Sequence, residues 1–247
     1  MNQNEYGSVR EIHNGNDESG DVSMACVDDY LGLTWDSSSP DTITCEGKPS
    51  AEKYLRFAVE DLKAGKDPRN VINAASNAKR ALHLRAELLS EAFGIHIKYP
   101  QNIIHFPRRL DFLRECGVVG GSVLNKLNKM RNEMEHEYLE PTADETQDFI
   151  DIVELFIAAT AIIVSSFPSY VELEYDSVVQ GGVEIRSIKF PVCEGEMFLF
   201  SPPNQIPNLR EMSTPELDGW LRMNSIRYTV HDEAYYEWVK WLLKAAI

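Results

Sequence analysis

Several motifs that identify common enzyme classes are missing from this chain. It has no glycine-rich phosphate loop, no Gly-x-Ser-x-Gly nucleophile elbow and no His-Glu-x-x-His zinc motif. Its six histidines also lack the spacing of metal ligands. The sequence therefore predicts neither a metal site nor a bound cofactor.

Cysteine is scarce, and its few copies are scattered. The four cysteines contain no Cys-x-x-Cys pair, and they lie at Cys26, Cys45, Cys116 and Cys193. This pattern predicts a reducing compartment and no structural zinc. The first residues lack a basic segment followed by an apolar one, so we expect no signal peptide and a cytoplasmic location.

Long apolar runs are absent as well. The longest, Leu155 to Val164, is too short to span a bilayer and follows Asp151 and Glu154. It indicates a buried core helix, and we expect no membrane association.

Positive charge is the minority sign, because the net charge is −15. An acidic surface repels phosphate, which argues at first against a nucleic-acid partner. Between residues 69 and 131, however, 11 Lys and Arg stand against four acids. One interpretation is a local basic face on an acidic molecule, and the other is ordinary solvated helix charge.

Three regions differ in composition and in the spacing of their apolar residues. Residues 1–50 hold ten acids against Arg10 and Lys48, and they predict an irregular extension with a turn at 37–41 and one short strand near 32–35. Residues 51–168 have helical periodicity, and residues 169–247 change to period two. The expected fold class is mainly α, an antiparallel helical bundle with a small C-terminal α+β region.

Cap and stop signals divide residues 51–168 into helices. Ser50 is an expected N-cap, and Thr142 with Glu145 forms an expected capping box. The predicted helices run from Ser50 to Gly65, from Pro68 or Asn70 to Phe93, from Arg108 to Glu115, through 124–138 as far as Pro141, and from Glu145 to Ser166. Any antiparallel four-helix bundle fits this periodicity equally well.

The remaining chain predicts a small sheet with two helices. Alternation over 170–176 and 183–192, on either side of Gly181-Gly182, indicates a hairpin. The further predicted elements are a strand at 196–200, a helix at 215–223 capped by Ser213 or Thr214, a strand at 226–230 and a last helix capped by Asp232.

The segment 124–138 places an arginine where an apolar residue belongs. Helical spacing aligns one apolar stripe, made of Leu124, Leu127, Met130, Met134 and Tyr138. Arg131 projects from the middle of that stripe. Because a buried guanidinium without a partner is costly, Arg131 is expected to face a paired carboxylate, a subunit interface or an anionic ligand.

The pattern Arg131-Asn132-x-x-x-His136-x-Tyr138 resembles the signature of the HEPN superfamily. The order of the predicted helices agrees with that family, many members of which are metal-independent ribonucleases. The resemblance implies that Arg131, Asn132 and His136 line a cleft between two protomers of a homodimer. Tyr138 extends it to toxin-like RNases of toxin-antitoxin and defence systems, in which a nucleotidyltransferase partner can modify the tyrosine.

Helix geometry separates the two charged residues of this motif. Arg131 and His136 are about 140° apart around a helix, so one straight helix does not bring them together. Either the helix unwinds before Pro141 or a two-fold axis joins two copies. Asn132 is a surface neighbour of His136 and can orient its imidazole, whereas Arg131 has an alternative intrahelical partner in Glu135.

The expected function is a metal-independent endoribonuclease that acts on single-stranded or loop RNA. The 2′-hydroxyl attacks the phosphate, His136 transfers a proton, Arg131 stabilises the charge on the phosphorane, and Asn132 positions His136 or the phosphate. Candidate RNA-binding residues are Lys126, Lys129, Arg108 and Arg109.

The alternative function is a noncatalytic helical interaction module that dimerises or binds a partner protein. Its support is the acidic balance and the flanking Glu133, Glu135 and Glu137. A positive cleft at the motif would favour RNA, and a negative groove would favour a basic protein.

Overall fold

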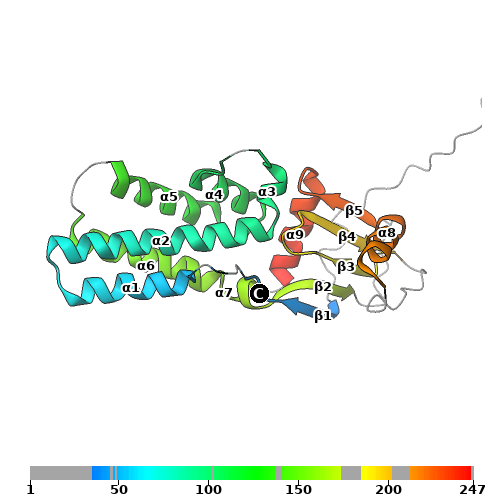
Figure 1. The fold of residues 1–247 in the computed structure, drawn as a ribbon, viewed down its shortest axis with the longest axis horizontal. Coiled ribbons are helices and arrows are strands. Elements are labelled where there is room, and N and C mark those ends of the chain that lie inside the picture. The colour runs from blue at the N-terminus through cyan, green and yellow to red at the C-terminus, as the bar shows by residue number, and fades with distance from the viewer. Residues whose placement is uncertain are drawn as a thin grey trace, which may run out of the picture.

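The computed structural model describes residues 35–44, 47, 49–101, 103–136, 141–173, 185–201 and 212–245. The fold is mainly α-helical with an α+β region, which confirms that part of the predicted fold class. Figure 1 shows most of the helices at one end of an elongated molecule, and a sheet of antiparallel strands with the last two helices at the other.

The first two helices begin and end close to the predicted residues. In α1 (Ala51–Ala64) the side chain of Ser50 accepts a hydrogen bond from the backbone N–H of Lys53, which confirms the N-cap. Asp67 caps α2 (Pro68–Ala92), which has a proline in its first turn. The inner face of α2 and the residue after it are buried at Val71, Ala74, Ala75, Ala78, Leu82, Leu89 and Phe93.

The following helices are α3 (Ile95–Lys98), α4 (Phe106–Glu115), α5 (Gly121–His136), α6 (Ala143–Ala159) and α7 (Ala161–Ser165). The Thr142–Glu145 capping box before α6 is confirmed. The helix predicted from Glu145 to Ser166 is wrong as one element, because Thr160 (φ −101°, ψ 2°) separates α6 from α7.

The apolar run across that break is only partly buried. Phe156, Ile157 and Ile163 lie in the core, whereas Leu155 and Ile162 are 67% and 44% exposed. The run therefore forms one wall of the helical region and is less buried than predicted. Within the described ranges, no helix is long and apolar enough to cross a membrane.

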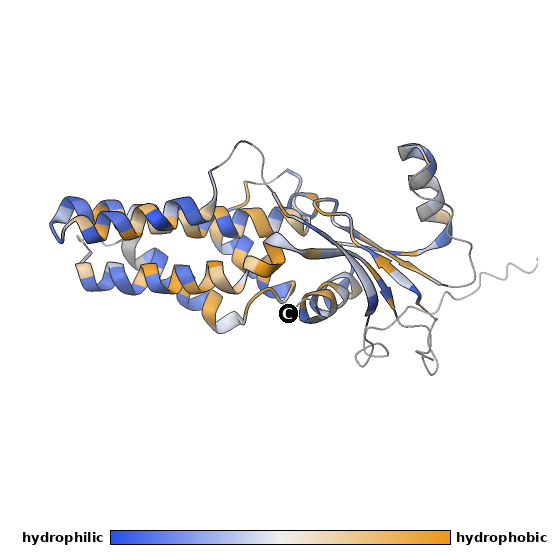
Figure 2. Cartoon of the chain, turned by 90° about the horizontal axis from the view of Figure 1, so that it is seen from below, coloured by the Kyte–Doolittle hydropathy of each residue, from blue (hydrophilic) through white to orange (hydrophobic). Residues whose placement is uncertain are grey.

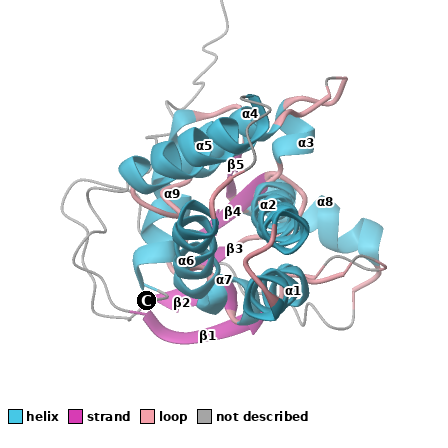
Figure 3. Ribbon diagram, turned by 90° about the vertical axis from the view of Figure 1, so that its left-hand side faces the viewer, coloured by secondary structure: helices cyan, strands magenta, loops and turns pink. Residues whose placement is uncertain are grey.

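The helices pack as two neighbouring sets. Figure 3 shows α1, α2 and α6 side by side, with α4 and α5 laid across α2 and α6. Their apolar residues face one another in Figure 2, and their outer faces are largely hydrophilic. In this arrangement α5 packs against α4, and α4 packs against α2.

The sheet has strand order β1-β2-β3-β4-β5, with every neighbouring pair antiparallel. The strands are β1 (Trp35–Asp41), β2 (Phe167–Leu173), β3 (Ser187–Lys189), β4 (Glu196–Phe200) and β5 (Ile226–Thr229), and the helices of this region are α8 (Thr214–Asn224) and α9 (Glu233–Ala245). The antiparallel pairing of the predicted hairpin is confirmed, but its second strand is shorter than the predicted 183–192, and Gly181-Gly182 lies outside the described residues. The strands at 196–200 and 226–230 and both helices are confirmed.

The first strand differs from the prediction. Residues 37–41, predicted as a turn, belong to β1, while Gly32 lies outside the described residues. Ser37 pairs with Glu172, and its hydroxyl donates to the Glu172 carboxylate over 3.0 Å. The prediction was wrong because this strand owes its conformation to β2 rather than to its own residues. Pro40 is tolerated because β1 is an edge strand.

The end of α2 is built into the sheet region. A Cβ placed on Gly94 (φ +86°) would lie 2.3 Å from the Cα of Gly195. The Tyr235 hydroxyl donates to the carbonyl of Phe93 over 2.8 Å, and Phe93 packs edge-on against Phe167. Helices and sheet therefore share one hydrophobic core. The predicted division at residues 50 and 168 stays a prediction.

Candidate functional site

Helices α2, α4 and α5 enclose an open, largely polar cleft of about 410 Å³. Its lining residues are His83, Glu87, Ile104, His105, Phe106, Pro107, Arg109 and Arg131. The arginine that interrupts the apolar stripe of α5 thus reaches a cleft that a ligand can enter. An anionic ligand is one of the three surroundings that the sequence allowed for Arg131.

The local structure of α5 explains how Arg131 reaches the cleft. Leu124 and Leu127 are buried, and Met130 packs against the same core. The Arg131 guanidinium lies over the ring of Phe106, with its carbon 5.6 Å from the ring centroid. This cation–π contact and the adjacent core hold the arginine at the wall of the cleft.

Asn132 contacts Arg131. Nη1 of Arg131 donates to Oδ1 of Asn132 over 3.0 Å. This bond can orient the guanidinium, and the predicted role of Asn132 at His136 or the phosphate stays a prediction, because the His136 side chain lies outside the described residues. The side chain of Glu135, the alternative partner of Arg131, lies outside the described part of the structure.

A histidine from α2 lies beside the same aromatic ring. His83 stacks on Phe106 with ring centroids 4.3 Å apart and an interplanar angle of 15°. Phe106 is buried and begins α4 directly after His105, which also lines the cleft. An imidazole and a guanidinium are thereby fixed around one ring at the cleft wall.

Arg109 connects α4 to α2, and its charge is balanced by a glutamate on α2. Its Nη1 donates to Oγ of Ser90 over 2.7 Å and to Oε1 of Glu91 over 2.8 Å. Its Nη2 lies 4.0 Å from Oε1 of Glu87. These contacts favour a positioning role that fixes α4, and with it Phe106, on α2.

The other predicted RNA-binding residues lie away from this cleft. Arg108 is exposed, and its guanidinium carbon lies 4.9 Å from the ring centroid of Tyr99. Lys126 lines a separate groove between α5 and α6, and Lys129 is exposed on α5. Among the four candidates, Arg109 is the one that lines the cleft with Arg131.

The helix that carries the motif is continuous as far as His136. Unwinding between Arg131 and His136 is therefore absent, and the two residues stay about 140° apart around the helix. The side chain of His136 and all of Tyr138 lie outside the described residues, as do the side chains of Glu133 and Glu137. The two-fold axis predicted to bring Arg131 and His136 together stays a prediction.

Sequence reasoning missed His83, Glu87, His105 and Phe106 as cleft residues. The available signal was the i, i+4 spacing of His83 and Glu87, which places them on one face of α2. That spacing could not identify the neighbour of this face, because the packing of α4 depends on long-range contacts. Among the described residues, no group of three His, Cys, Asp or Glu is placed to hold a metal ion.

Comparison with known proteins provides no relative. No known family model matches the chain, and no curated protein or solved structure is detectably similar to it.

Proposed function

We propose that the protein is a metal-independent endoribonuclease of HEPN type that acts on single-stranded or loop RNA. The observation that carries the proposal is the position of Arg131 beside His83 in an open polar cleft. The order of the helices, two long ones, a short one, the motif helix and a final apolar one, supports a HEPN-like bundle. Toxin or antiviral defence activity is the role that the motif suggests.

The chemistry needs an attacking oxygen, a proton acceptor and a stabilised phosphate. The ribose 2′-oxygen bonds to the adjacent phosphorus, and its proton passes to an imidazole. The bond from phosphorus to the 5′-oxygen then breaks, and that oxygen receives a proton. Arg131 binds the equatorial oxygens of the phosphorane, where a preorganised cation stabilises developing charge. The product ends are a 2′,3′-cyclic phosphate and a 5′-hydroxyl.

The charges of the cleft favour RNA over a basic protein partner. Its lining includes two arginines and two histidines, with Glu87 as the acidic member. Arg109 is held on α2 by Glu91, whereas the Arg131 guanidinium lies over Phe106 at the cleft wall, and we assign Arg131 to the phosphate on that position. The overall net charge of −15 still opposes long-range attraction of RNA, which makes the proposed affinity strongly dependent on salt.

The proposal is tested by cleavage of total RNA in EDTA. We expect cleavage by the wild-type protein, and we expect Arg131→Ala and His136→Ala each to lower the rate by at least ~10², the usual contribution of such groups. Arg56→Ala is the matched arginine control and His231→Ala the matched histidine control, because both residues are exposed and lie outside the cleft. Equal rates in all five proteins would reject the RNase.

The proposed site is composite, with Arg131 from one copy and His136 from a second. Because α5 is straight through both residues, we expect a two-fold homodimer, detectable by analytical ultracentrifugation. Refolding an equal mixture of Arg131→Ala and His136→Ala should restore about a quarter of wild-type activity, since half the dimers would hold one intact site of two.

Failure of the mixture to recover activity, with both variants inactive alone, would place both groups in one protomer. Full activity in His136→Ala, with activity lost in Arg131→Ala, would instead make His83 the imidazole that serves Arg131, because it lies in the same cleft. Tyr138 remains a proposed modification site for a nucleotidyltransferase or other antitoxin partner, since a nucleotidyl group there would add charge and bulk beside the motif.

A second candidate function is a noncatalytic interaction module. An apolar groove of about 470 Å³ between α5 and α6 favours it, because Leu155 in its wall is 67% exposed. A groove of this kind accepts the apolar face of a partner helix. Absence of RNase activity in a protein that still forms a dimer would support this function.

A further inference from the structure

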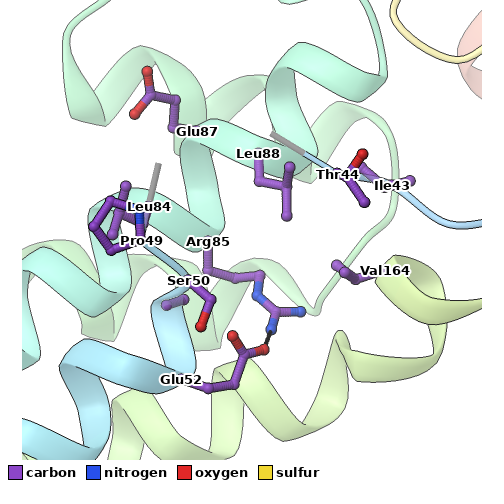
Figure 4. A pocket seen from close by; sticks show the side chains of 11 residues that line it. Ile43, Thr44, Pro49, Ser50, Glu52, Leu84, Arg85, Glu87, Leu88 and Val164 are labelled. Carbon is purple, nitrogen blue, oxygen red and sulfur yellow. Dashed lines mark hydrogen bonds and ion pairs between the residues drawn. The ribbon is translucent and has the colours of Figure 1, made fainter. Parts of the chain in front are cut away.

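A second cavity, of about 240 Å³, lies along α2 and shares Glu87 with the cleft described above. It is formed by α2, the first turn of α1 and the segment that follows β1. Its walls are mostly apolar and include Ile43, Pro49, Leu84, Leu88 and Val164. Figure 4 shows Arg85 extending between these walls, with Glu52 beside its guanidinium.

Arg85 is a buried cation with an incomplete set of hydrogen bonds. The residue is 1% exposed, and its Nη1 donates to the carbonyl and the hydroxyl of Thr160, over 3.3 Å in each case. Its Nη2 forms an ion pair with Glu52. Its Nε is buried and has no hydrogen-bond partner among the described residues. Since buried N–H groups normally find an acceptor, this donor indicates a missing one.

The charge of the cavity limits what that acceptor can be. Glu52 already matches the charge of Arg85, so an added carboxylate or phosphate would be an uncompensated anion. Glu87 also lines the cavity, and its carboxylate points away from Arg85 in Figure 4. A neutral acceptor is therefore favoured.

Glu52 supplies the second half of the recognition pattern. Its side chain is 56% exposed although it contacts Arg85, and Glu52 lines the cavity. The Arg85 N–H and the Glu52 carboxylate together offer one donor and one acceptor. A ligand that carries a carbonyl next to an N–H is complementary to this donor and this acceptor.

We propose that this cavity binds a small neutral amide whose carbonyl accepts from Arg85 Nε and whose N–H donates to Glu52. The apolar part of the ligand contacts Leu84, Leu88 and Val164. The volume is below the roughly 300 to 1,000 Å³ typical of pockets for drug-sized molecules, which limits the ligand to a small ring or short chain. The proposal is independent of the RNase function.

The test uses ε-caprolactam as the probe, with the full chain and ligand-detected saturation-transfer NMR. We expect saturable binding in the millimolar range, because a ligand of this size has few atoms to contribute. N-methylcaprolactam, which lacks the N–H, should bind at least ~10-fold more weakly, a factor typical of one lost hydrogen bond to a charged group. Hexanoate, an anion with a similar apolar chain, should not bind.

Three variants locate the binding. Leu88→Phe places a larger side chain in the cavity and should abolish the caprolactam signal, while Leu155→Phe, the same exchange in the separate α5–α6 groove, should leave it intact. Glu52→Gln should weaken binding at least ~10-fold by removing the charged acceptor. Circular dichroism spectra confirm that each variant is folded.

Each remaining result overturns the proposal. Equal binding of both lactams would show that Glu52 does not accept a hydrogen bond from the lactam N–H. Binding of hexanoate in place of the lactam would show that the cavity accepts anions. An unchanged signal in Leu88→Phe would place the lactam elsewhere, and absence of any signal in the folded wild-type protein would show that the cavity does not take a small amide.

Discussion

Replacing Gly94 with alanine is expected to lower the free energy of unfolding by about 3–5 kcal/mol, from a steric clash and an unfavourable backbone conformation together. The new Cβ would lie 2.3 Å from the Cα of Gly195, which is backbone and cannot rotate away. The φ of +86° is also one that residues with a Cβ rarely adopt. Urea denaturation followed by circular dichroism measures the change.

Gly47→Ala separates the two causes. Gly47 has a similar φ of +76°, but a Cβ there would meet nothing within 4 Å. Its substitution should therefore cost only about 1–2 kcal/mol, the conformational part alone. Equal losses in the two variants would show that the contact with Gly195 adds nothing, and would contradict the shared core at the end of α2.

Removal of Glu52 is expected to be more damaging than removal of its partner. Glu52→Ala leaves the guanidinium of Arg85, which is 1% exposed, without a counter-ion in the interior. Breaking a buried pair in this way costs about 3–5 kcal/mol. Burial already lowers the pKa of Arg85, and Glu52 is the group that opposes this shift.

Arg85→Ala should cost less, because the carboxylate left behind is 56% exposed to water. The double variant Glu52→Ala, Arg85→Met should recover much of the stability lost in Glu52→Ala, since it removes the buried charge. Glu60→Ala is the control, because Glu60 pairs with Arg56 at the surface of the same helix, over 3.9 Å. If Glu52→Ala lowers the free energy of unfolding no more than Glu60→Ala does, Glu52 does not stabilise the buried charge of Arg85.

The elements whose signals are local were predictable from the sequence. The Thr142–Glu145 capping box, the Ser50 cap and the inner face of α2 each depend on residues within a few positions of one another. The strand at 196–200 was predicted with its observed ends because its apolar residues follow the turn at Gly195. β1 was not predictable, since the partner of Ser37, Glu172, is 135 positions further along the chain.

The candidate site was predictable only in part. The misplaced charge of Arg131 indicated a paired carboxylate, a subunit interface or an anionic ligand, and Arg131 lines a polar cleft in the structure. The composition of that cleft depends on how α4 packs on α2, which Arg109 fixes through contacts with Ser90 and Glu91. No periodicity within α4 encodes those partners. His83 and Phe106 were therefore missed.

The pairing of β1 with β2 also has a consequence for how the chain folds. Residues 51–166, all of α1 to α7, lie between two strands that are neighbours in the sheet, so the sheet edge closes only after the helices have been synthesised. Such distant pairing slows folding. Until it occurs, β2 with its buried Val171 and Leu173 is an open edge. Once β1 is in place, Pro40 and the serines of its polar edge make a poor template for another chain, so β1 protects the protein against aggregation.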